Sequence, residues 1–117
     1  MDRVQCQSYI ENTYGAVGET LFAKYPSFRV FRHTGNRKWF AVIMEIPREK
    51  LGLSGGNIQV VNVKCDTRMI GSFRQEAGIY PGYHMNKAHW LTLALDGTVE
   101  ENKLKFLIDM SYGLTKG

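Results

Sequence analysis

The sequence predicts an α+β domain in which one antiparallel sheet carries its helices on a single face. Segments of alternating apolar and polar residues follow one another, separated by short turn signals, as in β-hairpins. Stretches with apolar residues at helical spacing stand before, between and after these segments. Sequential hairpins with flanking helices are typical of an antiparallel sheet covered on one side. The predicted order of elements is α-β-β-β-α-β-β-α.

A single domain, residues 1–117, is expected from the length and from the absence of any repeat, linker or low-complexity tract. Hydrophobic residues make up 44% and charged residues 22%, which is typical of a globular protein. The longest apolar run, residues 39–44, is far shorter than the roughly 20 residues of a membrane span. The first residues lack the apolar core of a signal peptide, so a cytoplasmic location is expected.

The first helix is expected to begin after Asp2. The Asp2 side chain can cap it, and Gln5, three residues on, completes a capping box. Gly15 suits the left-handed residue that commonly follows a helix. Between these positions, an apolar stripe at helical spacing is formed by Cys6, Tyr9, Ile10, Thr13 and Tyr14.

Three strands are expected next. Residues 28–33 alternate, residues 34–36 (Thr-Gly-Asn) are a turn signal, and residues 38–46 continue as a strand. This second strand is apolar on both faces, which predicts a place at the sheet centre. A proline ends it, and a glycine-rich connection with one helical turn at residues 48–51 leads to a third strand at residues 58–64.

A second helix is expected to follow Asp66, a good cap, and to end at Gly78, with an inward face formed by Met69, Ile70, Phe73 and Ala77. Residues 80–86 are expected to be a short strand or an extended loop, and residues 89–95 a strand. The last helix is expected to begin with a second capping box, and its core-facing residues would be Val99, Leu104, Leu107, Ile108 and Tyr112. That box would be formed by Thr98 and Glu101.

Four motifs in the second half occur in a characteristic order: Val-Asn-Val-Lys-Cys-Asp at 61–66, Pro-Gly-Tyr-His-Met-Asn-Lys-Ala-His-Trp at 81–90, Leu-Asp-Gly at 95–97 and Ser-Tyr at 111–112. Together they closely resemble the MmcQ/YjbR family of small bacterial proteins. The second motif is the specific one. The first 57 residues resemble the family only through a helix followed by an aromatic, basic hairpin. Thr67 departs from the family, which often has proline there, and this weakens only a helix start.

The resemblance implies a fold similar to those of secretion chaperones and frataxin-like proteins. It also implies a DNA-binding role, which has been inferred for the family from its shape and basic surface. The charge distribution agrees with an anionic partner, since the net charge is +4 and residues 20–44 hold five cations and no acid. The rest of the chain holds ten cations and eleven acids. The whole excess therefore lies in one stretch.

The first hairpin, residues 28–40, is predicted to be a basic wing. Its cations would contact phosphates and release counterions, and they are Arg29, Arg32, Arg37 and Lys38. The aromatic residues beside them could stack on bases if the target were single-stranded. The alternative is a buried strand pair whose cations only solvate the sheet edge and discourage aggregation.

Residues 83–90 are predicted to form a second wing, a tight hairpin that brings His84 and His89 together. Lys87 at its tip would contact phosphate, and Asn86 or His89 a base edge, with His84 in the same interface. In the alternative, Trp90 lies in the core, His84 bonds a backbone carbonyl and Asn86 takes a left-handed turn position.

Catalysis is not expected. Cys6 and Cys65 should be free thiols, because the chain has no CxxC motif and no disulfide framework. A helix start can activate Cys65, but the adjacent Asp66 opposes this and no oxyanion donors are evident. The histidines lack metal-binding spacing, so neither a metal nor a cofactor is expected.

These observations favour a small, non-enzymatic DNA-binding protein that uses two basic hairpin tips as a double wing. The alternative is a protein-interaction or chaperone-like module with no nucleic-acid role. The expected partner is therefore DNA or another protein, and not a membrane. The sequence leaves open the oligomeric state and whether the two tips face the same side.

Overall fold

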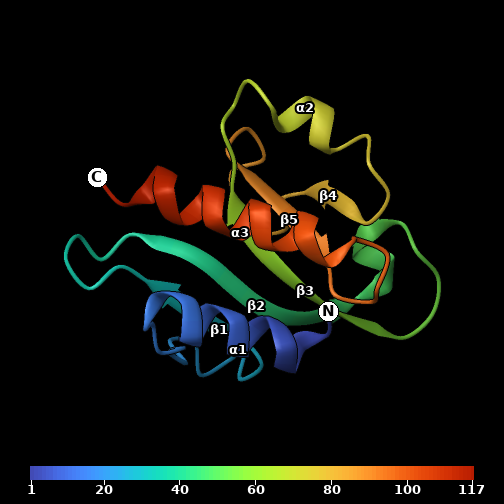
Figure 1. Ribbon diagram of the computed structural model, residues 1–117. Helices are drawn as coiled ribbons and strands as arrows, with labels where there is room; N and C mark the ends of the chain where they lie inside the picture. The colour runs from blue at the N-terminus through green and yellow to red at the C-terminus, as the bar shows by residue number, and fades with distance from the viewer.

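The computed structural model describes all 117 residues, and it confirms the α+β class and the predicted order of elements. One five-stranded antiparallel sheet has the order β1-β2-β3-β5-β4. Figure 1 shows α1 and α3 lying across the same side of the strands. The elements are α1 (Arg3–Tyr14), β1 (Arg29–Arg32), β2 (Trp39–Pro47), the 3-10 turn η1 (Arg48–Leu51), β3 (Asn57–Lys64), α2 (Ile70–Phe73), β4 (Ile79–Pro81), β5 (Trp90–Ala94) and α3 (Glu101–Thr115).

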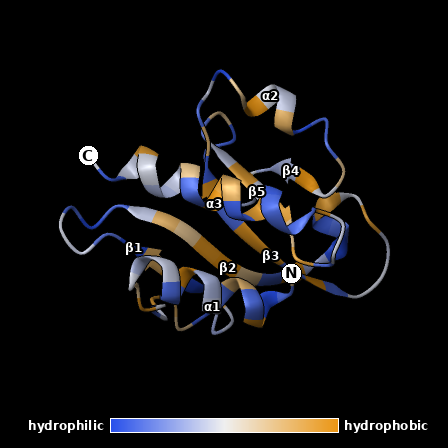
Figure 2. Cartoon of the chain, in the orientation of Figure 1, coloured by the Kyte–Doolittle hydropathy of each residue, from blue (hydrophilic) through white to orange (hydrophobic).

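The main core lies between the sheet and its two long helices. Alternate residues of the inner strands, such as Ile43, Val61 and Leu93, meet Ile10 of α1 and Leu107 of α3. All five side chains are buried, and burying each one stabilises the fold by roughly 1.5–3 kcal/mol. Figure 2 shows this apolar character concentrated along the central strands, while the loop between β1 and β2 is hydrophilic. None of the helices is long and apolar enough to cross a membrane.

The opposite face of the sheet is covered by loops, with no helix packed on it. Its strands bury a second, smaller apolar cluster that includes Val42, Met44 and Val60. The residues packed over this cluster come from the segment before β1, from the region of η1 and from the ends of strands, and they are Phe22, Trp39, Leu51, Leu53, Tyr80 and Tyr83. We call this side of the sheet the loop face.

A β-bulge assigns the aromatic residues of β2 to the two faces. Phe31 pairs with Ala41 but Arg32 pairs with Trp39, so Phe40 is an extra residue in its strand. Phe40 and Ala41 therefore both join the helix-side core, while Trp39 packs on the loop face. The alternation of the sequence alone does not reveal this shift.

The predicted ends of the first helix are confirmed. Asp2 and Gln5 form the capping box, and Gly15 has a φ of 66° in the left-handed region. The helical turn at residues 48–51 is also confirmed, as a 3-10 turn. The strand predicted for the sheet centre, β2, is an inner strand, and the central position belongs to β3.

Two predicted helix starts are wrong. The second helix is a single turn, and Asp66 accepts the backbone N–H of Arg68 in a turn ahead of it. Met69 and Ala77 are therefore exposed, because the helix is too short to present an inward stripe. The cap of α3 is Glu100, whose carboxylate accepts the N–H groups of residues 102 and 103. Thr98 cannot fill that role because its own N–H is held by Asp96 in the preceding turn.

Candidate nucleic-acid interface

Two loops leave the sheet at the same end. Because neighbouring strands are antiparallel throughout, β1 and β4 both finish at the end where β2 and β5 begin. The loop of residues 33–38, here tip one, and the loop of residues 82–89, here tip two, therefore share that end. The midpoints of their strand pairs are three strand positions apart in the sheet, which corresponds to about 14 Å. The sequence left open whether the two tips face the same side, and the structure places both at the same end of the sheet.

Tip one is anchored to the C-terminal end of α3, which Figure 1 shows beside it. The Asn36 side-chain amide donates to the Thr115 carbonyl oxygen at 2.8 Å, and its oxygen accepts the Lys38 N–H. His33 is 9% exposed, and its Nε2 lies 2.8 Å from the Thr115 hydroxyl. Burial lowers the pKa of His33, and the nearby Lys116 and Lys38 lower it further against an opposing backbone contact with Tyr112. The neutral imidazole is therefore a structural anchor of the tip.

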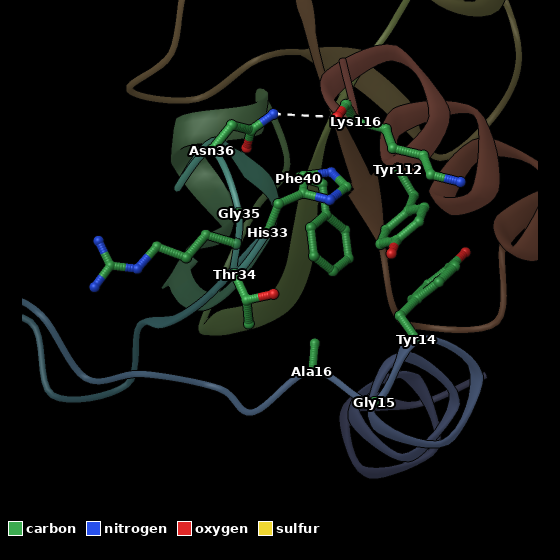
Figure 3. Close-up of a pocket in the computed structure, with 11 residues that line it drawn as sticks. Tyr14, Gly15, Ala16, His33, Thr34, Gly35, Asn36, Phe40, Tyr112 and Lys116 are labelled. Carbon is green, nitrogen blue, oxygen red and sulfur yellow. Dashed lines mark hydrogen bonds between the residues drawn. The ribbon is translucent and has the colours of Figure 1, made fainter.

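A cavity of about 210 Å³ lies between tip one and the ends of α1 and α3. Figure 3 shows the rings of Tyr14 and Tyr112 facing each other at its edge, with centroids 4.2 Å apart. Tyr9 and Tyr14 both donate their hydroxyl to Asp109, and burial together with that carboxylate raises the pKa of Tyr14. The hydroxyls of Tyr9 and Tyr14 and the anchoring side chains of tip one already have hydrogen-bond partners. We therefore regard the cavity as part of the contact between tip one and α3.

The four predicted cations of the first hairpin do not share one role. Arg37 and Lys38 are exposed at the tip and pair with no acidic side chain, and Arg37 has a φ of 66°. The Lys38 ammonium donates to the carbonyl oxygen of Gly117 at 3.1 Å. Arg32, in contrast, lies 2.7 Å from the carboxylate of Glu19.

Arg29 stands at the far end of β1 from the tip. Its guanidinium donates to the Pro26 carbonyl oxygen at 2.7 Å. Arg29 and Arg32 are thus engaged away from the tip, and the charge exposed at the tip of the first hairpin is carried by Arg37 and Lys38.

Tip two is not the tight hairpin that the sequence predicts. The Gly82 N–H donates to the Trp90 carbonyl oxygen. Two successive turns follow: in the first the Met85 N–H donates to the Gly82 carbonyl oxygen, and in the second the His89 N–H donates to the Asn86 carbonyl oxygen. A Cβ on Gly82 would lie 2.7 Å from the Cβ of Trp90, so glycine is required for this close approach.

The side chains of tip two differ from the predicted arrangement. The His84 ring packs on Tyr83, with 4.0 Å between centroids, and His84 takes the left-handed conformation with a φ of 60°. Asn86 is not the left-handed residue, and its side-chain oxygen accepts the Ala88 N–H. Trp90 is only half-buried. The alternative arrangement is therefore absent in all three features: Trp90 is not in the core, Asn86 is not left-handed, and the His84 ring makes no hydrogen bond to a backbone carbonyl but packs on Tyr83.

Tip two presents all four of its predicted interface residues to the surface, namely His84, Asn86, Lys87 and His89. It is braced from behind, because the His89 carbonyl oxygen accepts the Cys65 N–H at 2.7 Å. The Lys87 ammonium donates to the Gly82 carbonyl oxygen at 3.2 Å, and the Lys87 carbonyl oxygen accepts from Arg74. These hydrogen bonds fix the conformation of the loop, although its strands do not extend into a long β-ribbon.

The fold adds cations that the sequence reasoning missed. Residues 33–38, 64–69, 82–89 and 115–117 meet at this end, which we call the cationic end, and their cationic side chains are Arg37, Lys38, Lys64, Arg68, Lys87 and Lys116. The one acidic side chain among these residues, Asp66, is bonded to Arg68, which lowers the pKa of Asp66 to about 2. Lys64 and Lys116 lie far from the basic stretch in sequence, and only the register of strands and helix brings them to it.

The thiols are poorly placed for nucleophilic chemistry. Cys65 is 2% exposed, and burial together with the neighbouring Asp66 raises its pKa. Burial raises the pKa of Cys6 to about 12. Since the thiolate is the reactive form, neither side chain is activated at neutral pH. No group of three or more His, Cys, Asp or Glu side chains is placed to hold a metal ion.

Comparison with known proteins identifies relatives over almost the full chain. The family model described as YjbR matches residues 12–114. The protein YyaQ of Bacillus subtilis, described as uncharacterised, is 39% identical over 109 residues, which are 92% of each chain. The protein YjbR of Escherichia coli, described in the same way, is 35% identical over 57 residues, 48% of each chain.

Solved structures show the same fold. A crystal structure of a Pseudomonas syringae protein superposes with a TM-score of 0.96 at 40% identity, covering 98% of this chain and 99% of that one. A Deinococcus radiodurans protein superposes with a TM-score of 0.73 at 25% identity, covering 97% and 77% of the two chains. The fold class is therefore confirmed independently of the sequence reasoning.

Proposed function

The chain belongs to the YjbR family, and we propose that it is a non-enzymatic DNA-binding protein that contacts the phosphate backbone with its cationic end. The observation that carries this proposal is the meeting of tip one and tip two at one end of the sheet. Six cationic side chains lie there, five of them exposed, against one acidic side chain that is already paired with Arg68. The two tips would act as a double wing.

Unpaired cations favour a polyanion for a physical reason. A cation that neutralises a phosphate releases condensed counterions, and this gain does not require that a particular base be read. Arg37, Lys38 and Lys87 are the main phosphate contacts in this proposal. Asn86 and His89 are exposed in the same tip as Lys87 and are the candidates for hydrogen bonds to base edges.

The proposal is tested by fluorescence anisotropy of a random-sequence duplex at about 50 and about 200 mM salt. The wild-type affinity should fall steeply as salt increases. Replacing Arg37 and Lys38 together with alanine should flatten the slope of log affinity against log salt by about 2. An unchanged slope in this variant would contradict the phosphate contacts.

The matched control removes two lysines elsewhere. Lys103→Ala with Lys105→Ala produces the same net charge, but these lysines lie on α3 and pair with Glu76 and Glu101 at 3.2 and 3.3 Å. This control should retain the wild-type slope. If the control loses the slope equally, net charge rather than the cationic end attracts the DNA.

A protein-interaction module is the second candidate. It is favoured by exposed apolar side chains in the segment before β1, where Val17, Leu21 and Tyr25 are among the most exposed large hydrophobic residues. In that case light scattering should find a defined dimer or complex, and the anisotropy titration should find no affinity for DNA even at low salt.

A further inference from the structure

Two hollows on the loop face meet at tip two. The first, of about 210 Å³, is lined by Phe22, Tyr25, Phe28 and His84. The second, of about 170 Å³, is lined by Lys50, Leu51, Tyr80, Pro81, Tyr83 and Lys87. His84 lines one hollow and Tyr83 the other, and their rings are 4.0 Å apart. One aromatic pair therefore separates the two hollows.

The aromatic rings of the first hollow are fixed in place without being covered. Tyr25 stacks on Phe28 with 4.9 Å between centroids and 18° between planes. Phe22 meets the same Phe28 edge-on at 6.1 Å. Phe28 is buried whereas Tyr25 is 42% exposed, so the outer side of the stacked pair faces solvent, with the Lys24 ammonium 5.9 Å from the Tyr25 ring centroid. A ring held in this way is ready to stack on a further planar group.

Both hollows carry positive charge beside their rings. Lys50 and Lys87 line the second hollow, and the ammonium of Lys24 lies 5.9 Å from the Tyr25 ring centroid beside the first. No acidic side chain lines either hollow. A purely apolar partner would gain nothing from these lysines, and a paired duplex offers no open base faces to the rings.

Single-stranded nucleic acid complements both features of this surface, its aromatic rings and its lysines. Its bases expose planar faces that stack on aromatic side chains regardless of sequence, and its backbone carries a phosphate at each step. We infer that the loop face binds single-stranded nucleic acid, with unpaired bases on the rings of the two hollows and phosphates on Lys24, Lys50 and Lys87. This inference rests on the proposed binding of nucleic acid, and it names the strand type that the protein prefers. Lys87 joins the loop face to the cationic end.

The test compares an oligothymidylate of about 12 nucleotides with a duplex of about 12 base pairs, at low salt and with the full chain. The single strand should bind more tightly than the duplex. Tyr25→Leu and Tyr83→Leu should each weaken single-strand binding by about 5- to 150-fold, the range expected for the loss of one stacked base. Tyr25→Leu, which lies outside both tips, should leave duplex affinity within about twofold, because duplex binding depends on phosphate contacts.

Two kinds of control accompany these variants. Tyr25→Phe and Tyr83→Phe keep the ring and should retain single-strand binding. Phe106→Leu removes a 51% exposed ring from α3, on the other face of the sheet, and should change neither affinity. Since Tyr25 is 42% exposed, its variant still tests the inference if Tyr83→Leu, which removes a half-buried ring packed on the loop-face cluster, loses stability.

The outcomes separate the two proposals. If duplex binds but the single strand binds no better, or if the leucine variants retain full single-strand affinity, the inference is wrong and the cationic end remains supported. A phenylalanine variant as weak as its leucine counterpart would also overturn it, because the ring would not be the binding group. If neither nucleic acid binds, the proposed function itself fails.

Discussion

The two ends of the sheet use their charged residues in opposite ways. At the cationic end, six cationic side chains face a single carboxylate, which is already bonded to Arg68. At the other end, residues 48–56 and 95–100 hold two cations and three acids. Two of those acids complete local structure, because Asp96 holds a turn and Glu100 caps α3. Two of the three acidic side chains at the other end serve the fold, whereas five of the six cations at the cationic end have no acidic partner, which is why we place the ligand at the cationic end.

The largest expected effect separates position from net charge. Arg37→Ala with Lys38→Ala should weaken duplex binding roughly 200-fold at about 50 mM salt and roughly 20-fold at about 200 mM, since the lost counterion term fades near 1 M. Adding Glu49→Lys at the opposite end restores the net charge of the wild type. Anisotropy should show no recovery of affinity in this triple variant. Full recovery of affinity would mean that net charge, and not the position of the cations at one end of the sheet, determines DNA binding.

The two tips differ in how they are held, and glycine substitution makes this measurable. Gly82→Ala in tip two forces a Cβ to within 2.7 Å of Trp90. It should lower the free energy of unfolding by about 1–3 kcal/mol, the usual range for overpacking. Gly35→Ala in tip one meets nothing within 4 Å and should leave stability almost unchanged. Urea unfolding of both variants gives the comparison, and equal stabilities would contradict the close packing of tip two.

Tip one depends on α3 rather than on its own packing. With the Thr115 hydroxyl proton assigned to the Ser111 carbonyl oxygen, 2.8 Å away, His33 is the donor in its contact with the same hydroxyl. Thr115→Val leaves that buried imidazole N–H without a partner and should cost about 1–3 kcal/mol of stability. Thr115→Ser keeps the hydroxyl and should cost less. The two are compared by urea unfolding, and a Thr115→Val variant as stable as the wild type would contradict this role of the hydroxyl.

The predictions from sequence succeeded where local chemistry decides the structure. The Asp2 capping box and Gly15 depend on residues a few positions apart, and alternation located all three strands of the first half. Residues 66–78 were harder, because Gly71 and the turn at Asp66 leave only one helical turn in a segment whose apolar pattern resembles a longer helix.

The candidate site was only partly accessible from sequence. Exposure of Arg37, Lys38 and Lys87 follows from their turns, which sequence identifies. The pairing of Arg32 with Glu19, and the arrival of Lys64 and Lys116 at the same end, depend on contacts between distant segments. The turns of tip two came from its own hydrogen bonds, which replaced the ribbon that residue types alone favour.

The smallest expected effect is a pH dependence that belongs to tip one alone. The folded-state pKa of His33 is lowered by burial and by the charges of Lys38 and Lys116, which face it from the tip and from the end of α3. In the unfolded chain the ordinary pKa is about 6.5. Between the two values the unfolded state binds more protons, so stability must fall as pH decreases through this window. Asp66, whose folded-state pKa is about 2, affects stability only at a pH below this window.

Urea midpoints of the wild type at pH 7.5 and pH 5 should therefore differ by more than those of His33→Gln, in which the position has no titrating group. Tip two should contribute equally to both proteins, so the difference isolates the anchor. If the two proteins lose stability equally, the imidazole is as easily protonated in the folded state as in the unfolded one. Tip one would then be solvated rather than fastened to α3, and the contrast between the two tips would be lost.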